Sequence, residues 1–300
     1  MPEYVSSSTA VDLSRLPAPA VVEQLSFEQI YAAGLARLLE LKPDFDATVE
    51  SDPAVKLLQV FAYRELLLRQ EANDRLRQVM VAYATGSNLD QLGALFGVAR
   101  LVVRPADPQA GIEEQLETDE SLRERIVLAP ESYSVAGPEL AYIFHAKTAH
   151  PAVLDASCVS PAPGEVVVSV LSRHGDGAAP PEVLGAVEAR VNARDVRPLT
   201  DHVTVQSAEI IPFAIKASIH TFTGPDVTVV AAEARRRLEA YIDESRKLGR
   251  DVTISSIDAA LTAPGVQRVE RETPLAHIVC SPFQAAHCTS IEIEHGGYED

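Results

Sequence analysis

The chain has 300 residues, of which 46% are hydrophobic and 23% charged, so it holds enough apolar mass for two or three folded domains and is no disordered polypeptide. Its formal net charge of −17, from 26 Lys+Arg against 43 Asp+Glu, disfavours direct nucleic-acid binding, because phosphates are neutralised by Lys and Arg. No run of about 18 apolar residues and no basic-then-apolar leader occurs, so we expect neither membrane insertion nor a secretion signal.

Residues 1–26 are predicted to form an extended N-terminal arm. Pro17 and Pro19 disfavour helix at the residues that precede them. The arm also carries more apolar side chains than a solvated tail needs, among them Leu13, Leu16 and Val21. We therefore expect it to lie on another protein surface, of this chain or of a partner.

Residues 27–130 are predicted to be helical. Ser26 with Gln29 forms a capping-box start for a helix over residues 27–41. Asp52 and Pro53 start a second helix, through an N-capping carboxylate and Pro at the first helical position. Neither Gly nor Pro follows until Gly86, so this helix is predicted to continue for about 33 residues.

Apolar side chains recur along the second helix at spacings of three, four or seven residues. The run of leucines at 66–68 widens this face beyond one stripe, which predicts burial on more than one side, as in a helix bundle. The helix therefore fills the core of its own domain or packs with helices of partner chains. The candidate partner-binding residues are Leu57, Phe61, Leu68, Leu76, Val79 and Tyr83.

Two shorter helices complete this region. Residues 89–96 are predicted to form an amphipathic helix that Gly97 ends, and a polar connection around residues 104–111 follows. Thr118 then caps a further helix that ends before Pro130.

Beyond residue 130 helices and strands alternate, which predicts two mixed α/β domains over residues 131–222 and 223–300. The fold class is therefore α+β, with a bundle-forming helical region ahead of the two domains. Strands are predicted over residues 152–160, 165–171, 203–207, 213–222 and 265–271. Helices are predicted over residues 138–147, 181–194, 227–247 and 255–261.

The sequence contains no phosphate loop, nucleophile elbow, zinc-protease motif or dinucleotide fingerprint. The loop that holds His174 and Asp176 follows a buried strand, where α/β enzymes bind ligands, although its two glycines also suit a plain turn. Cys280 and Cys288, with histidines nearby, are candidate metal ligands. Their spacing fits no standard zinc module, and buried thiols in strands explain them well without a metal.

Eight short segments, in this order along nearly the whole chain, resemble the baseplate assembly protein J family of contractile phage tails and phage-tail-like bacteriocins. They are LSRLPAP (13–19), ESDPAVKLL (50–58), AYREL (62–66), SNLD (87–90), LRERI (122–126), SVAGP (134–138), SPAPG (160–164) and VRPLTD (196–201).

The resemblance implies a structural, non-enzymatic wedge protein of the baseplate, with no cofactor. Its expected partners are wedge proteins similar to baseplate proteins I and W, further copies of itself in a ring of six wedges, and the central spike-bearing hub. The N-terminal helices are expected to join a bundle with a second copy and the I-like protein. The expected location is the particle baseplate, assembled in the bacterial cytoplasm, and the expected action is a rearrangement that triggers sheath contraction.

Two alternatives stay open at this point. One is an enzyme of unknown class that uses the His174/Asp176 loop, and the other is a metal-binding module that uses Cys280 and Cys288. Neither accounts for the broad apolar surface of the second helix.

Overall fold

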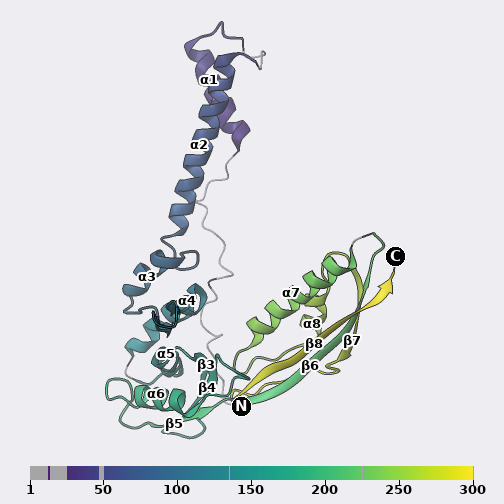
Figure 1. Cartoon of the computed structure of the whole chain (residues 1–300). Helices are drawn as coiled ribbons and strands as arrows, with labels where there is room; N and C mark the ends of the chain where they lie inside the picture. The colour runs from purple at the N-terminus through teal and green to yellow at the C-terminus, as the bar shows by residue number, and fades with distance from the viewer. Residues whose placement is uncertain (1–12, 14–25, 47–50, 135, 225, 300) are drawn as a thin grey trace. The chain divides into compact units, whose positions relative to one another are not determined.

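Figure 1 shows a computed structural model of the chain, which describes residues 13, 26–46, 51–134, 136–224 and 226–299. The described chain forms two compact units, of which one ends at Gly97 and the other begins at Val98. Helices come first in the chain, and two three-stranded mixed sheets follow. The predicted α+β fold class is thus confirmed.

The first unit consists of α1 (Phe27–Leu41), α2 (Pro53–Arg77) and α3 (Gly86–Ala94). The helix starts follow the predicted capping: Ser26 Oγ accepts a hydrogen bond from the amide of Gln29 at 3.4 Å, and Asp52 Oδ1 accepts one from Ala54 at 2.7 Å. Local side-chain chemistry therefore sets where α1 and α2 begin.

The second helix is shorter than predicted, because α2 ends at Arg77 and turns follow. The side-chain oxygen of Gln78 accepts hydrogen bonds from the amide of Thr85 at 3.0 Å and from Asn88 Nδ2 at 3.2 Å. These hydrogen bonds connect the residue after α2 to the first turn of α3, where the prediction had the helix continue. No Gly or Pro is needed to end the helix here.

The second unit begins with a small ribbon and a helix. β1 (Val102–Arg104) pairs antiparallel with β2 (Gln115–Leu116), so the predicted polar connection is flanked by strands. Helix α4 (Asp119–Leu128) starts at Thr118, whose hydroxyl accepts a hydrogen bond from Ser121 N at 3.3 Å. A 3-10 turn over Ala129–Tyr133 follows.

The first mixed sheet has the strand order β3-β4-β5. β3 (Val153–Val159) and β4 (Glu165–Ser172) are antiparallel, whereas β4 and β5 (His202–Ser207) are parallel. α6 (Pro181–Val191) is the crossover that the parallel pair requires, and α5 (Glu139–Ala149) precedes β3. The fully buried valines of this layer are Val168, Val170, Val183, Val187 and Val191.

The second mixed sheet has the order β7-β6-β8. Its central strand is β6 (Glu209–Thr221), antiparallel to β7 (Val266–Thr273) and parallel to β8 (Gln284–Tyr298). The predicted domain over residues 131–222 thus includes β6, whereas both strands that pair with β6 lie in residues 223–300. β8 is not among the predicted strands, because much of it is polar, and its pairing with β6 continues through these polar residues to Tyr298.

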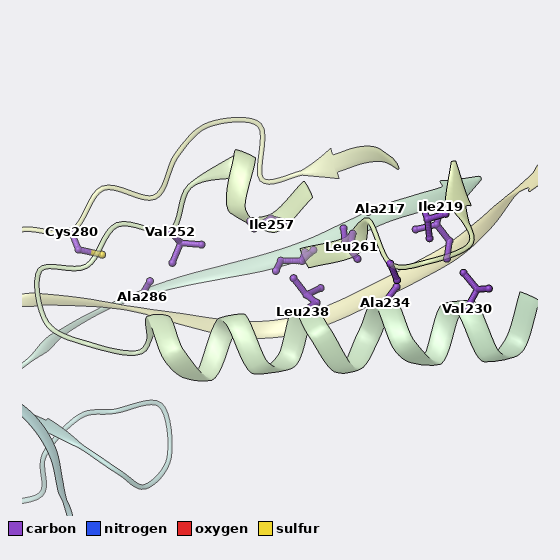
Figure 2. Packing of buried hydrophobic residues seen from close by; sticks show 13 residues of the cluster. Ala217, Ile219, Val230, Ala234, Leu238, Val252, Ile257, Leu261, Cys280 and Ala286 are labelled. Atoms are coloured by element: carbon purple, nitrogen blue, oxygen red, sulfur yellow. The ribbon is translucent and has the colours of Figure 1, made fainter. Parts of the chain in front are cut away.

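Helices α7 (Val227–Ser245) and α8 (Ile254–Leu261) cover one face of this sheet (Figures 1 and 2). Alternate β6 residues point into the core, and α7 contributes side chains four residues apart, as their periods of two and 3.6 require. The fully buried members include Ile215, Ala217, Ile219, Ala234, Leu238, Ile257 and Leu261.

An ionic joint, formed by Glu124, Lys147, Asp155 and Lys247, links the two α/β parts of this unit. Lys147 Nζ lies 2.8 Å from Glu124 Oε2 and 3.6 Å from Asp155 Oδ1, and its side chain is only 3% exposed. Glu124 Oε1 lies 2.8 Å from Lys247 Nζ, just after α7. Asp155 Oδ2 also accepts a hydrogen bond from Leu248 N at 3.0 Å. The joint thereby connects α4, α5 and β3 to the end of α7.

Candidate protein-protein interface

One side of α2 packs against α1, and the two helices lie side by side (Figure 1). Gly34 of α1 marks the close approach, because a Cβ atom there would lie 3.0 Å from Leu58 Cδ1 of α2. Ile30 of α1 and both Val55 and Ala62 of α2 are buried. Residues 55, 58 and 62 recur at spacings of three and four, so they share one side of the helix.

A second apolar face lies on the opposite side of α2. At 3.6 residues per turn, the centre of this face lies about half a turn from Ala62. This outer face consists of Leu57, Val60, Phe61, Leu67 and Leu68, whose exposed fractions are 58%, 56%, 68%, 41% and 60%. A contiguous group of exposed, large apolar side chains is typical of a surface that binds another protein.

Charged residues accompany the outer face. Arg64 falls within it by helical position and forms no ion pair with any residue that the structure describes. On the flanks, Glu65 pairs with Arg69 and Glu71 with Arg75, both at 2.6 Å and four residues apart. An unpaired cation inside an apolar stripe favours a partner helix that carries a carboxylate at the same level.

The predicted partner-binding residues divide between this face and the turns beyond it. Leu57, Phe61 and Leu68 belong to the outer face. Val60 and Leu67 also belong to it but are not among the predicted residues, although the leucine run at 66–68 signalled Leu67. Leu76 is 42% exposed near the end of α2. Val79, 66% exposed, and Tyr83, half-buried, follow the helix and so do not continue its face. Of the arm residues, Leu13 is half-buried, and Leu16 and Val21 lie outside the described residues.

The loop that holds His174 and Asp176 is a turn stabilised by hydrogen bonds. Asp176 Oδ1 accepts a hydrogen bond from the amide of Ala178 at 3.0 Å, and Ser172 Oγ accepts one from the amide of His174 at 3.2 Å. Arg246 donates to the carbonyl oxygen of Gly175 at 2.8 Å. The Asp176 side chain and the His174 backbone amide thus take part in local contacts of the loop, and this geometry favours the turn interpretation.

The cysteines also show no metal-binding arrangement. Within the described ranges, no three His, Cys, Asp or Glu side chains are grouped so that they could hold a metal ion. Cys280 is buried and lies before β8, whereas Cys288 lies within it. Burial and the nearby Asp251 raise the pKa of Cys280 to about 11, so its thiol is protonated at neutral pH. The arrangement gives the metal alternative no support.

None of the helices in the described part of the chain combines the length and the apolar character that a membrane crossing requires.

Comparison with known proteins gives consistent matches along the chain. The Baseplate J-like N-terminal domain matches residues 50–107, the Baseplate J-like central domain residues 134–207, and the Baseplate J-like protein C-terminal domain residues 213–294. Baseplate protein J of Escherichia phage P2 is 44% identical over 299 residues, which cover 97% of this chain and 99% of that protein.

A chain of the anti-feeding prophage (AFP) baseplate, a six-fold symmetrised cryo-EM structure, is 16% identical. The match has a TM-score of 0.38 and covers 59% of this chain and 43% of that one. At this TM-score the match gives no information about the arrangement of the present chain.

Proposed function

We propose, from the premise that this chain belongs to the Baseplate J-like family of baseplate structural proteins, that it is a wedge subunit of a contractile tail. In this role it holds the hub and the inner ring of the baseplate until contraction is triggered. The protein is a structural component of a phage-type tail, and we assign it no catalytic role.

The outer face of α2 is the observation that best supports a subunit role. Fully burying a Leu, Val or Phe side chain is worth about 1.5–3 kcal/mol relative to leaving it in water. The chain leaves five such side chains of one helix exposed, each by at least 41%. A protein that worked as a monomer would gain nothing from this surface. In a bundle with partner helices, the same side chains supply the binding free energy.

The bundle partners in this proposal are a second copy of the chain and an I-like wedge protein. Arg64 then pairs with a carboxylate of the I-like helix. The Leu13, Leu16 and Val21 arm, together with Leu76, Val79 and Tyr83, adds apolar contacts along the bundle. A W-like protein and the spike-bearing hub complete the set of neighbours, and six wedges close the ring.

Triggering requires that contacts between wedges rearrange while each subunit stays folded. The ionic joint is consistent with this view, because its ion pairs and hydrogen bond, which include the buried Lys147 and Asp155, join the two α/β parts of one subunit. We therefore assign the rearrangement to contacts between subunits. As the wedges move outward, the ring opens and the sheath is released to contract.

Co-expression with the products of the neighbouring genes tests this proposal, with the complex measured by size-exclusion chromatography and light scattering. The wild-type chain should elute in a hetero-oligomer of fixed stoichiometry. The double variant Leu57→Asp, Phe61→Asp should elute alone, with an unchanged melting temperature because both side chains are exposed in the free chain. Val229→Asp is the matched control, since Val229 on α7 is 65% exposed but lies outside the outer face.

The wedge role would be refuted if the wild-type chain stayed a stable monomer and bound none of the co-expressed proteins. A complex that survives the double variant would instead exclude the outer face of α2 as its binding surface.

A further inference from the structure

One edge of the second mixed sheet has no partner strand in the described part of the chain. Of the strands described, β8 pairs only with β6, in the order β7-β6-β8. The amide of Glu209, at the start of β6, donates to the carbonyl oxygen of Phe283 at 2.9 Å. At the end of β6, the carbonyl oxygen of Thr221 accepts from the amide of Glu299 at 3.0 Å. Backbone groups alternate between the two sides of a strand, so the odd-numbered residues of β6 direct theirs to β8.

The β8 residues opposite these positions direct their backbone groups away from β6, as the slanted hydrogen bonds of a parallel pair require. Ile291, Ile293 and His295 are three such residues. The carbonyl oxygen of Ile291 accepts a hydrogen bond from Arg235 of α7, at 3.0 Å, and Arg235 also pairs with Glu239 at 3.4 Å. Beyond the pairing of β8 with β6, none of the residues that the structure describes bonds the amides or carbonyls of Ile293 and His295. We call residues 290–295, with their outward backbone groups, the β8 edge.

The β8 edge lacks most of the features that keep a sheet edge unpaired. Proteins protect such edges with short strands, Pro, Lys or bulges. β8 has 15 residues, and residues 290–295 contain neither Pro nor Lys. The register with β6 shifts only before residue 290 and after residue 295, so the edge between these two points is regular. A regular, unpaired edge is a template on which an extended segment of another chain adds as a further strand.

Side chains of the β8 edge alternate between two chemical types. Ile291 and Ile293 lie on the side of α7 and are half-buried against the core. Glu292 and Glu294 are exposed on the opposite face of the sheet. Because neighbours across a strand pair share a face, an added strand places one set of alternate residues beside the isoleucines and the other set beside the glutamates.

The charges around the edge indicate which residues fit beside the glutamates. Lys216 lies opposite Glu292 in register, but it forms its ion pair with Glu272 of β7, at 3.0 Å. The hydrogen bond and charge of Glu272, with the charges of Glu294 and Glu292, raise the pKa of Lys216. Glu292 and Glu294 form no ion pair with any residue described. Three carboxylates thus share one ammonium group, and Lys or Arg of an added strand would neutralise the excess.

A second copy of this chain fits the β8 edge less well. If its β8 added here, glutamates would lie beside glutamates. Its β7 carries Glu270 and Glu272 on the corresponding face, and Arg268 of that strand already pairs with Glu270 and Glu299. Like charges placed opposite each other destabilise strand pairing. The edge therefore favours a strand of a different protein.

We propose that the β8 edge is a strand-addition site for an extended segment of a different baseplate protein, with apolar residues toward α7 and Lys or Arg beside Glu292 and Glu294. This inference rests on the proposed function only in placing the partner within the baseplate. The site lies in the unit that begins at Val98 and uses none of the outer face of α2.

Amide hydrogen exchange tests the site at single residues. The full chain is measured alone and in complex with the co-expressed products of the neighbouring genes, and fragmentation in the mass spectrometer separates adjacent amides. We expect exchange at Ile293 and His295 to slow by about 10-fold or more in the complex, because these amides gain carbonyl partners. The amides of Glu292 and Glu294 are the internal control, since they already face β6 and should change little.

Charge reversal tests the chemistry of the partner. The double variant Glu292→Lys, Glu294→Lys should weaken retention of the partner about 10-fold, because two attractive pairs across the strands become repulsive. Both side chains are exposed, so the melting temperature of the isolated chain should stay near that of the wild type. The control Glu113→Lys, Glu114→Lys makes the same change in net charge at two exposed glutamates outside the sheet and should retain the partner fully.

Unchanged exchange at Ile293 and His295 in an intact complex overturns the proposal, as does wild-type retention by the charge-reversed variant. An equal loss of the partner in the Glu113→Lys, Glu114→Lys control, or protection of the edge by self-association alone, also overturns it. If the outer-face double variant dissociates the complex while the edge amides never gain protection, the wedge proposal survives and only the strand-addition site is lost. If the chain forms no complex at all, both proposals are wrong.

Discussion

Replacing Glu124 with Gln tests whether the ionic joint contributes to stability as its geometry indicates. Glu124 bridges Lys147 and Lys247, each at 2.8 Å. Burial raises the pKa of Glu124, but the charges of the two lysines outweigh burial and lower that pKa to about 2, from an ordinary value of 4.5. The charged form is therefore the stable one in the folded protein.

The magnitude follows from linkage between protonation and folding. Each pKa unit is worth about 1.36 kcal/mol, so the lowering corresponds to at most ~3 kcal/mol at neutral pH. One third of the Glu124 side chain is exposed, and solvent screening reduces this value. In the variant, Lys147 still has Asp155 as an ion-pair partner at 3.6 Å, which reduces the loss further. We therefore expect Glu124→Gln to lower the free energy of unfolding by about 2 kcal/mol at pH 7.

The sign of the pH dependence is specific to a lowered pKa. The stabilisation is fully present above the unfolded-state pKa near 4.5 and is lost as the pH falls toward 2. Gln cannot titrate, so the wild type and the variant should converge over this range. Urea unfolding of the full chain, followed by far-UV circular dichroism at several pH values, measures the difference.

Glu188→Gln is the matched control, because Glu188 is exposed on α6 of the same unit. It should leave the free energy of unfolding within about 0.5 kcal/mol of the wild type. The reasoning is refuted if Glu124→Gln is as stable as the wild type at pH 7. A difference that persists unchanged down to pH 2 would also refute it, since the effect would then not arise from the charge.

Two further predictions concern glycine packing and thiol reactivity. Gly296→Ala places a Cβ atom 2.5 Å from the ring of His220 and should lower the free energy of unfolding by about 1–3 kcal/mol. Gly185 lies inside α6 with open space around it, so Gly185→Ala should raise the free energy of unfolding by up to about 1 kcal/mol. Thermal unfolding of the two variants and the wild type measures both effects. Burial raises the pKa of Cys158 to about 12 and that of Cys280 to about 11. Both thiols should therefore react with Ellman's reagent at pH 7.5 only when the chain unfolds. Rapid labelling of these two cysteines in the native chain would contradict their burial.

Part of the outer apolar face of α2 could be predicted from the sequence, because a helix face is a local property; that this face binds a partner stays a prediction. The spacing that identified Leu57, Phe61 and Leu68 depends only on the 3.6-residue period, and all three prove to be exposed. The same pattern could not show where α2 ends. That end depends on hydrogen bonds between Gln78 and residues seven and ten positions later, which no propensity or spacing rule encodes.

The starts of α1, α2 and α4, the α+β class and the family could be read from the sequence, since capping residues, periodicity and short ordered motifs are all local features. The start of α3 could not, because this helix begins at Gly86 and not near residue 89. The strands that pair with β6, and the burial of Lys147 beside two carboxylates, became known only from the fold. The same holds for the close approach of Gly137 and Gly164 to residues 198–201. The physical reason is that a side chain's burial and partners depend on segments distant in the chain, and only the folded arrangement brings those segments together.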